Sequence, residues 1–227
     1  MKSIIISGTS SGLGKYLNNS ILGSIALNRD NLSDYYEKHY DVIIHCASPS
    51  ERQSKRIIYE SEKLLNDLLK INHHIFVFIS TIDIYRDPES FYSKSKLNCE
   101  KILKNHPHSL ILRSSMILGP TMRENHITKI RNNENLTLSG ESTFNYIAMK
   151  NFKIALTFDN LLTSKGIYDF VSTDNLNIEE VKKILNSSSI TGSYNYDTPK
   201  EFENPIYNTF PKLTFSSEQA LKESMYE

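Results

Sequence analysis

The stretch IIISGTSSGLGKYLNNS, residues 4–20, decides the fold of this 227-residue chain. An apolar run passes into a turn whose glycines, Gly8, Gly12 and Gly14, have the spacing G-x-x-x-G-x-G, and a helical pattern follows. In a strand–turn–helix unit the first glycine permits a tight turn, the second lets the backbone approach a pyrophosphate, and the third allows the helix to pack on the sheet. The stretch alone fits either a dinucleotide-binding loop or a purely structural turn.

The helix after the turn would direct free N–H groups and the positive end of its dipole at phosphates. The second apolar run ends at Asn28-Arg29-Asp30, where a cofactor would be selected. Arg29 would receive the 2′-phosphate of NADP, whereas an acidic residue would bind the 2′-hydroxyl of NAD. We predict NADP, and Asp30 keeps NAD open as the alternative. The predicted cofactor contacts in these two segments are Gly8, Thr9, Ser10, Ser11, Gly12, Leu13, Gly14, Asn28 and Arg29.

The first half of the chain alternates between short apolar runs and helical patterns. The apolar runs are 3–7, 24–28, 40–48, 74–81 and 109–115, and the helical patterns are 13–19, 54–71 and 92–103. The runs are continuously apolar, as are the strands of a parallel sheet that is covered on both faces. We therefore predict an α/β fold with a Rossmann-type doubly wound parallel sheet.

The character of the chain changes near Gly119, after which asparagine, threonine and charged residues become frequent. One further strand pattern occurs at 165–173 and one helix pattern at 177–186. We predict a dinucleotide-binding core over 1–120 and a small C-terminal substrate-binding lobe over 121–227 that is interleaved with the end of the core sheet. The tail, which contains three prolines, is expected to be irregular but packed.

The composition limits the possible partners. Lysine plus arginine and aspartate plus glutamate number 26 each, and this zero net charge argues against a general nucleic-acid binder. No apolar run approaches the ~20 residues of a membrane helix, and the N-terminus lacks the pattern of a signal peptide. We expect a cytoplasmic protein without a membrane partner. Cys46 and Cys99 are expected to be free thiols, and no Cys/His spacing predicts a metal site.

The stretch FYSKSKLNCEKIL (91–103) places Tyr92 and Lys96 four residues apart, on one face of a helix. A tyrosine is a poor proton donor or acceptor near neutral pH, but an adjacent ammonium group stabilises the phenolate and brings it into working range. The preceding strand ends at Ser80-Thr81, so hydroxyl groups lie at the carboxyl edge of the sheet, where ligands bind in such folds.

Taken in order, these motifs resemble those of the short-chain dehydrogenases/reductases, and more specifically the extended group that acts on nucleotide sugars. The resemblance covers residues 3–120. It rests on the glycine loop, DVIIHCAS (41–48), ISTIDIY (79–85), the Tyr92/Lys96 pair with its following helix, and LRSSMILGP (112–120).

The resemblance implies a role for each of these side chains. Tyr92 would be the general acid/base, and Lys96 would bind the nicotinamide ribose and tune Tyr92. Thr81, with Ser80 as the alternative, would hydrogen-bond the substrate carbonyl or hydroxyl. Further contacts with the cofactor are expected from Cys46, Ala47 and Ser48.

The chain departs from the family pattern in several places. Its glycine spacing matches compact members rather than extended ones, and only 11 residues lead from Thr81 to Tyr92, fewer than extended members carry. In the segment STFNYIAMKN (142–151) the family's arginine, histidine and aspartate are absent. Arg123 or Arg131 would replace the missing arginine, or each is an ordinary surface residue. The predicted substrate contacts are Asp83, Arg123, Arg131 and Tyr146.

The resemblance implies an NADP-dependent reductase of a nucleotide-linked keto-sugar, in the biosynthesis of surface-polysaccharide sugars, with Tyr92 as the proton donor. Arg29 and the small second lobe favour this reaction. Two alternatives stay open: an NAD-dependent nucleotide-sugar epimerase and a non-catalytic NADP-binding regulator. Dehydration is disfavoured because Ile82 and Asp83 stand where dehydratases carry Asp-Glu. A homodimer through the helices that begin near residues 54 and 92 is a further expectation.

Overall fold

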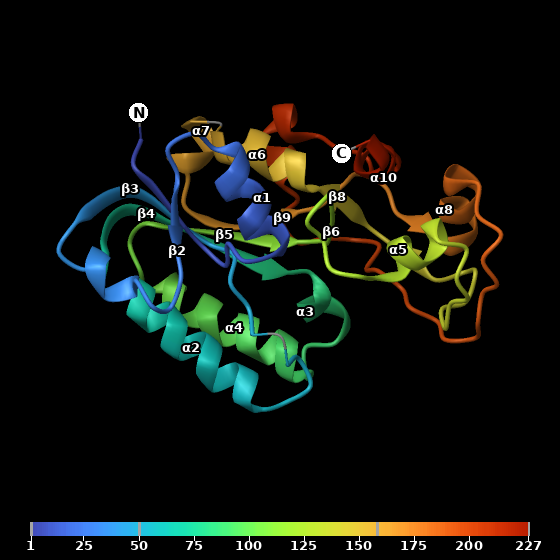
Figure 1. Ribbon diagram of the computed structural model, residues 1–227, viewed down its shortest axis with the longest axis horizontal. Coiled ribbons are helices and arrows are strands. Elements are labelled where there is room, and N and C mark those ends of the chain that lie inside the picture. Colours follow the sequence, from blue (N-terminus) through green and yellow to red (C-terminus); the bar gives the residue numbers. More distant parts are fainter. Residues whose placement is uncertain (1, 50, 158, 227) are drawn as a thin grey trace.

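The computed structural model describes residues 2–49, 51–157 and 159–226 and contains a central six-stranded sheet (Figure 1). All six strands are parallel, in the order β2-β1-β3-β4-β5-β9. Their bounds are β1 Ile4–Ser7, β2 Ile25–Leu27, β3 His39–His45, β4 Asn72–Thr81, β5 Ser109–Ser114 and β9 Gly166–Phe170. The predicted doubly wound parallel sheet is confirmed, and its last strand comes from the second half of the chain.

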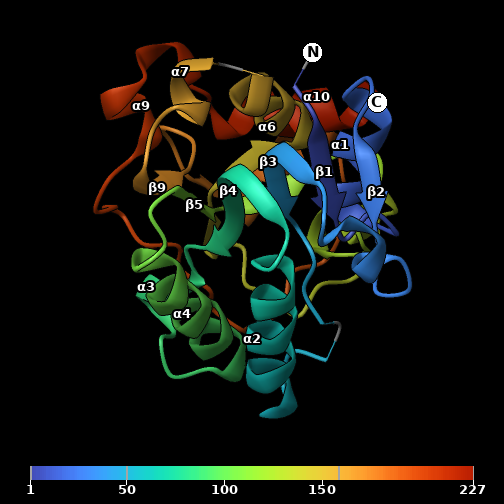
Figure 2. The same ribbon diagram turned by 90° about the vertical axis from the view of Figure 1, so that its left-hand side faces the viewer.

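Helices cover both faces of this sheet (Figures 1 and 2). On one face lie α2 (Arg56–Leu68) and α4 (Phe91–Lys104), and on the other α1 (Gly12–Ser20), α6 (Met149–Thr157) and α7 (Asp159–Leu162). β4 shows why both faces need a cover. Phe76 and Phe78 pack into the apolar cluster under α2 and α4, whereas Ile75, Val77 and Ile79 pack into the cluster under α1 and α6. A strand buried on both faces must be apolar at every position.

A smaller layer lies beside the main sheet (Figure 1). β6 (Met116–Leu118) pairs with β8 (Tyr146–Ala148) in parallel, and β7 (Thr143–Phe144) pairs with β10 (Leu176–Asn177) antiparallel. A third apolar cluster joins these strands to helices on either side. Those helices are α5 (His126–Arg131), α8 (Ile178–Leu185) and α10 (Ser217–Tyr226). The sequence patterns do not predict the helix α10.

The proline-containing tail, residues 194–215, is irregular and packed, as predicted. Within it lie the short helix α9 (Ile206–Thr209) and a 3-10 turn at Pro211–Leu213. Its side chains Ile206, Leu213 and Phe215 are buried in the cluster under α1 and α6. Both cysteines are free thiols. Among the helices that the structure describes, none is long and apolar enough to cross a membrane.

Buried histidines link the stability of this fold to pH. His45, at the end of β3, is 2% exposed and shares a 2.7 Å hydrogen bond with Ser7 Oγ. Burial, helped by the ammonium of Lys96, lowers the pKa of His45 from 6.5 to about 3. Burial also lowers the pKa of His126 to about 4. Both rings are therefore neutral in the native state under conditions where the unfolded chain protonates them.

We expect the free energy of unfolding to fall as the pH decreases from 6.5 towards 4. Each folded pKa lies below the unfolded value, so the unfolded state binds more protons in this window, and each histidine contributes a slope of up to ~1.4 kcal/mol per pH unit. Urea unfolding at a series of pH values measures the slope. His45→Gln should flatten it, and a variant with the unaltered slope would show that His45 is not a source of the pH dependence.

Candidate active site

A cavity of about 1110 Å³ opens at the carboxyl ends of β1, β3, β4 and β5. The strand order reverses between β1 and β3, because the chain adds β2 on one side of β1 and then continues on the other. In open α/β sheets ligands bind in the crevice at this switch point. The cavity is lined by the glycine turn, the end of β2, the segment after β3, the end of β4, the start of α4 and residues of the smaller layer.

Each of the three positions in the turn requires glycine for a different physical reason. Gly8 and Gly12 have φ values of +79° and +60°, in the left-handed region that favours glycine. A Cβ on Gly8 would lie 2.6 Å from the backbone nitrogen of Ala47, and one on Gly14 would lie 2.4 Å from the carbonyl oxygen of Gly8. A Cβ on Gly12 would meet nothing within 4 Å. Gly12 therefore faces open space, whereas Gly14 packs on the turn and does not line the cavity.

The amino end of α1 supplies hydrogen-bond donors to the cavity. The first N–H groups of a helix have no carbonyl partner within it, and Ser11, at the N-cap, forms no side-chain cap. Gly12 gives its N–H to the carbonyl oxygen of Thr121 at 2.9 Å, which leaves that of Leu13, a cavity residue, for an anion. The buried Ser48 Oγ, also at the cavity, has no hydrogen-bond partner among the described residues. These donors fit a dinucleotide.

The end of β2 meets the cavity at the predicted residues. Asn28 and Arg29 line it, and Asp30 does not. Asn28 Oδ1 accepts the backbone N–H groups of Asp30 and Asn31, at 2.9 and 3.1 Å, and so shapes the turn after the strand. Of the two charged residues that compete in the sequence, the arginine is the one at the cavity.

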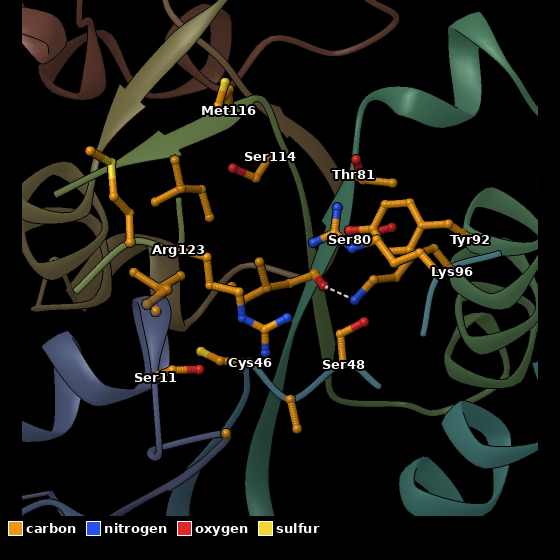
Figure 3. Close-up of a pocket in the computed structure, with 18 of the residues that line it drawn as sticks. Ser11, Cys46, Ser48, Ser80, Thr81, Tyr92, Lys96, Ser114, Met116 and Arg123 are labelled. Carbon is orange, nitrogen blue, oxygen red and sulfur yellow. Dashed lines mark hydrogen bonds between the residues drawn. The ribbon is translucent and has the colours of Figure 1, made fainter. Parts of the chain in front are cut away.

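The predicted catalytic pair lies on α4. Ser90 caps this helix by accepting the N–H of Ser93 at 3.2 Å, which places Tyr92 and Lys96 in its first turns. The ammonium of Lys96 is buried, donates to the carbonyl oxygen of Ile79 at 2.9 Å and lies 5.9 Å from the centre of the Tyr92 ring (Figure 3). Thr81 lines the same cavity, so the 11-residue path to Tyr92 does not separate them.

That short path folds as the helix α3 (Asp83–Arg86) followed by a turn. The backbone N–H of Asp83 donates to Thr81 Oγ1 at 3.2 Å, and the backbone N–H of Ser90 donates to Asp87 Oδ1 at 3.2 Å. These local bonds hold both ends of the path without a longer loop.

Ser80, predicted as the alternative to Thr81, has a different hydrogen-bond partner from Thr81. Ser80 borders the cavity, but its hydroxyl donates to Glu100 Oε1 of α4 at 2.6 Å. Successive side chains on a strand point to opposite faces, so Ser80 follows Phe78 towards α4 and Thr81 does not. Glu100 is also bound by Arg113 at 2.8 Å, so the Ser80 hydroxyl belongs to a buried network rather than to a substrate site.

The predicted substrate residues divide into two pairs. Asp83 and Arg123 line the cavity, and Figure 3 shows the side chain of Arg123 directed into it. Arg131 does not line it, because its guanidinium donates to Ser224 Oγ at 2.6 Å on the far side of α5. Tyr146 is fully buried in the third apolar cluster. Arg131 and Tyr146 therefore lie outside the lining of this cavity.

Several cavity residues have no signal in the sequence. Tyr196, from the tail, donates to Asp83 Oδ1 at 2.9 Å, and its ring stacks on Phe144 at 4.4 Å with an interplanar angle of 2°. The guanidinium of Arg86 covers that ring at 4.3 Å. The guanidinium of Arg52 lies 4.4 Å from the centre of the Tyr92 ring. The partners in these contacts are far apart in the chain, so no local sequence pattern predicts them.

Histidine also enters the site through the smaller layer. His126 lines the cavity and shares a 2.8 Å hydrogen bond with the hydroxyl of Tyr146, so Tyr146 supports the wall from behind. Within the described residues, no group of three or more histidine, cysteine, aspartate or glutamate side chains could hold a metal ion.

The chain matches no family model and no curated protein, but it is similar to solved structures over its whole length. UDP-N-acetylglucosamine 4-epimerase from Bacillus cereus has a TM-score of 0.79 at 16% identity, with 100% of this chain and 96% of that chain covered. dTDP-4-dehydrorhamnose reductase from Bacillus anthracis, in complex with NADP, has a TM-score of 0.78 at 17% identity, with 99% of each chain covered.

A third similar structure is RMD from Pseudomonas aeruginosa complexed with NADPH, with a TM-score of 0.74 at 15% identity, 100% of this chain and 98% of that chain. At these identities the likeness establishes the fold. The chain thus has the α/β fold found in nucleotide-sugar epimerases and reductases, which is the fold that the sequence resemblance implied.

Gly8 and Gly12 are predicted to differ when each is changed to alanine. Gly12→Ala should cost about 1–2 kcal/mol of stability from its positive φ alone, yet weaken dinucleotide binding at least about tenfold because the methyl enters the open space. Gly8→Ala adds a clash with the β3 segment and should destabilise the protein more. Thermal unfolding and titration with NADPH measure both effects. Equal stability losses would contradict the packing difference.

Thr81 and Ser80 provide a second matched pair. Thr81→Ala should lower kcat about 10²-fold because it removes a donor at the substrate, and should cost about 1 kcal/mol of stability because the Asp83 N–H loses its acceptor. Ser80→Ala should instead cost about 1–3 kcal/mol of stability, since it removes a buried hydrogen bond to Glu100, and should leave kcat within about threefold. The reverse pattern would restore Ser80 as the substrate donor.

Proposed function

We propose that this protein is an NADP-dependent reductase of a nucleotide-linked keto-sugar. The observation that carries the proposal is that one cavity brings the glycine turn together with Thr81, Tyr92 and Lys96. A dinucleotide loop alone fits many proteins, but a tyrosine and a buried lysine beside it fit proton transfer to a carbonyl. The fold similarity to dTDP-4-dehydrorhamnose reductase in complex with NADP supports the same reading.

NADP would be held by residues whose donors face the cavity. The N–H groups at the start of α1 would bind the pyrophosphate, and Ser48 offers a buried hydroxyl without another partner. Arg29, at the end of β2, would bind the 2′-phosphate, which is why we propose NADP over NAD. When bound, reduced NADP supplies a hydride to the substrate carbon.

The chain's own residues manage the proton and the oxygen. Tyr92 would donate its hydroxyl proton to the carbonyl oxygen as that oxygen gains negative charge, and Thr81 would orient the same oxygen by hydrogen bonding. The ammonium of Lys96 is fixed by the Ile79 carbonyl, which keeps its charge near the Tyr92 ring. That charge would stabilise the phenolate left after proton transfer.

A nucleotide-sugar epimerase is the second candidate. It is favoured by the similarity to epimerases such as the Bacillus cereus enzyme and ADP-L-glycero-D-manno-heptose-6-epimerase from Helicobacter pylori, which has a TM-score of 0.79 at 14% identity and covers 99% of this chain and 95% of that chain. The two reactions differ in what they do with the cofactor. A reductase releases its oxidised cofactor after each turnover, whereas an epimerase retains it. Tight copurifying NAD would therefore favour the epimerase, and exchangeable NADPH the reductase.

A homodimer through α2 and α4 stays a prediction. The exposed side of α2 carries ion pairs within the helix, Arg56 with Glu60 at 2.6 Å and Lys63 with Asp67 at 3.9 Å. Tyr59, on the same helix, is 68% exposed. A contact made by such a side would be mostly polar, and sedimentation of the purified protein at several concentrations and two salt strengths would detect it.

Tyr92→Phe tests the proposed chemistry directly. We expect kcat for keto-sugar reduction to fall by about 10²–10⁴-fold because the proton donor is lost, and the Kd for NADPH to stay within about twofold because the ring remains. Tyr59→Phe, at an exposed tyrosine of α2, serves as the matched control. If the unaltered protein binds NADPH but reduces no nucleotide-linked keto-sugar, a non-catalytic regulator replaces the reductase as the better reading.

A further inference from the structure

The loop that joins β6 to α5 is attached to the glycine turn. The N–H of Gly12 donates to the Thr121 carbonyl oxygen at 2.9 Å, and Thr121 Oγ1 donates to the Gly12 carbonyl oxygen at 2.7 Å. Thr121 Oγ1 also lies 3.3 Å from Met149 Sδ, and a Cβ on Gly119 would lie 2.7 Å from the same sulfur. We call the two hydrogen bonds between Gly12 and Thr121 the clasp. It fixes a segment of the second half of the chain on the turn that faces the cavity.

Arg123 follows the clasp by two residues. Two residues span at most about 7 Å, so its Cα lies within that distance of the Thr121 Cα and its long side chain can reach ligands bound at the turn. Figure 3 shows this side chain directed into the cavity. None of the ion pairs among the described residues uses Arg123. The clasp thus holds the backbone of an exposed arginine close to the amino end of α1.

The other cations at the cavity are occupied or placed elsewhere. Lys96 is bound to the Ile79 carbonyl oxygen. Arg52 and Arg86 lie on the rings of Tyr92 and Tyr196. Arg29 follows the end of β2 and is not next to either residue of the clasp in the sequence. Among the described cavity residues, Arg123 is the cation that the structure attaches to the glycine turn itself.

We propose that Arg123 binds the diphosphate of the dinucleotide, opposite the amino end of α1, rather than the substrate. This inference rests on the proposed function and refines the predicted substrate role of Arg123. In the clasp the N–H of Gly12 is bonded to Thr121, so it is not available to a phosphate. The same segment brings the guanidinium of Arg123, which would replace that donor. A guanidinium can offer two parallel N–H donors to phosphate oxygens, whereas a backbone N–H offers one. Replacing the Gly12 N–H by Arg123 therefore favours an anion with two phosphates.

The proposal separates two arginines by the part of the cofactor that each one reads. The diphosphate is common to NADP and NAD, whereas the 2′-phosphate is present only in NADP. Arg123 should therefore matter equally for both dinucleotides. Arg29 should matter only for NADP. Arg86 lines the same cavity but is stacked on Tyr196. Substituting Arg86 therefore removes an equal charge from the cavity without removing a contact to either phosphate group.

The experiment is a titration of the unaltered protein and four variants with NADPH and with NADH, followed by the fluorescence of the reduced nicotinamide because the chain has no tryptophan. Arg123→Gln should weaken both Kd values about tenfold, the loss of one charged hydrogen-bonding partner. Arg29→Gln should weaken NADPH alone. Arg86→Gln, the matched control, should leave both Kd values within about twofold. Thr121→Val, which removes the Oγ1 bond of the clasp, should weaken both dinucleotides by a smaller factor.

Each outcome decides between named alternatives. If Arg123→Gln leaves both Kd values unchanged while raising the KM for a nucleotide-linked keto-sugar, Arg123 binds the substrate and the inference is overturned. If Arg86→Gln weakens both cofactors as much as Arg123→Gln, the effect is one of total charge and the inference also fails. If the Arg123→Gln losses occur but the unaltered protein reduces no keto-sugar, the inference stands and the proposed reaction fails. If the unaltered protein binds neither dinucleotide, both fail.

Discussion

The contact between Gly8 and the backbone of Ala47 is the constraint on which the site depends. The turn after β1 passes so close to the segment after β3 that a Cβ on Gly8 would lie 2.6 Å from a backbone nitrogen. This approach is possible only at a residue without a side chain and with positive φ. It allows the segments that follow the paired strands β1 and β3 to stay close at the switch point of the sheet. It also sets where α1 begins, because Gly14 packs directly on the Gly8 carbonyl.

A second constraint lies under the floor of the cavity. Glu100 accepts hydrogen bonds from Ser80 and Arg113, and Arg113 also binds the Tyr85 hydroxyl at 2.6 Å, which in turn donates to Asp169 at 2.8 Å. A buried ion pair gains little net stability, because its desolvation offsets its attraction. Its effect here is positional. The network spans β4, β5 and β9 and binds the Ser80 hydroxyl towards α4, so of the two hydroxyls at the end of β4 the one of Thr81 stays outside the network.

The sequence predicts the elements that follow a local rule and misses those that depend on distant contacts. Continuous apolar runs identify the strands of the main sheet, and the four-residue spacing identifies Tyr92 and Lys96, because both patterns arise within one element. Choosing Thr81 over Ser80 requires knowing which face of β4 carries α4. Tyr196 reaches Asp83 across 113 positions, and no periodicity encodes such a contact. Arg131 at the end of α5 and Tyr146 in β8 lie outside the cavity for the same reason, since which side of each element faces the cavity depends on distant contacts.

The wall of the cavity around Tyr196 fits the reduction that we propose better than an epimerisation. Tyr196 is covered on its two faces by Phe144 and Arg86, and its hydroxyl is bound to Asp83. A side chain held by stacking and by a hydrogen bond cannot swing aside without losing all three contacts. An epimerase must let the sugar turn over between two hydride transfers, which requires space that opens and closes. A reductase delivers one hydride to one face and benefits from a wall that fixes a single orientation of the sugar.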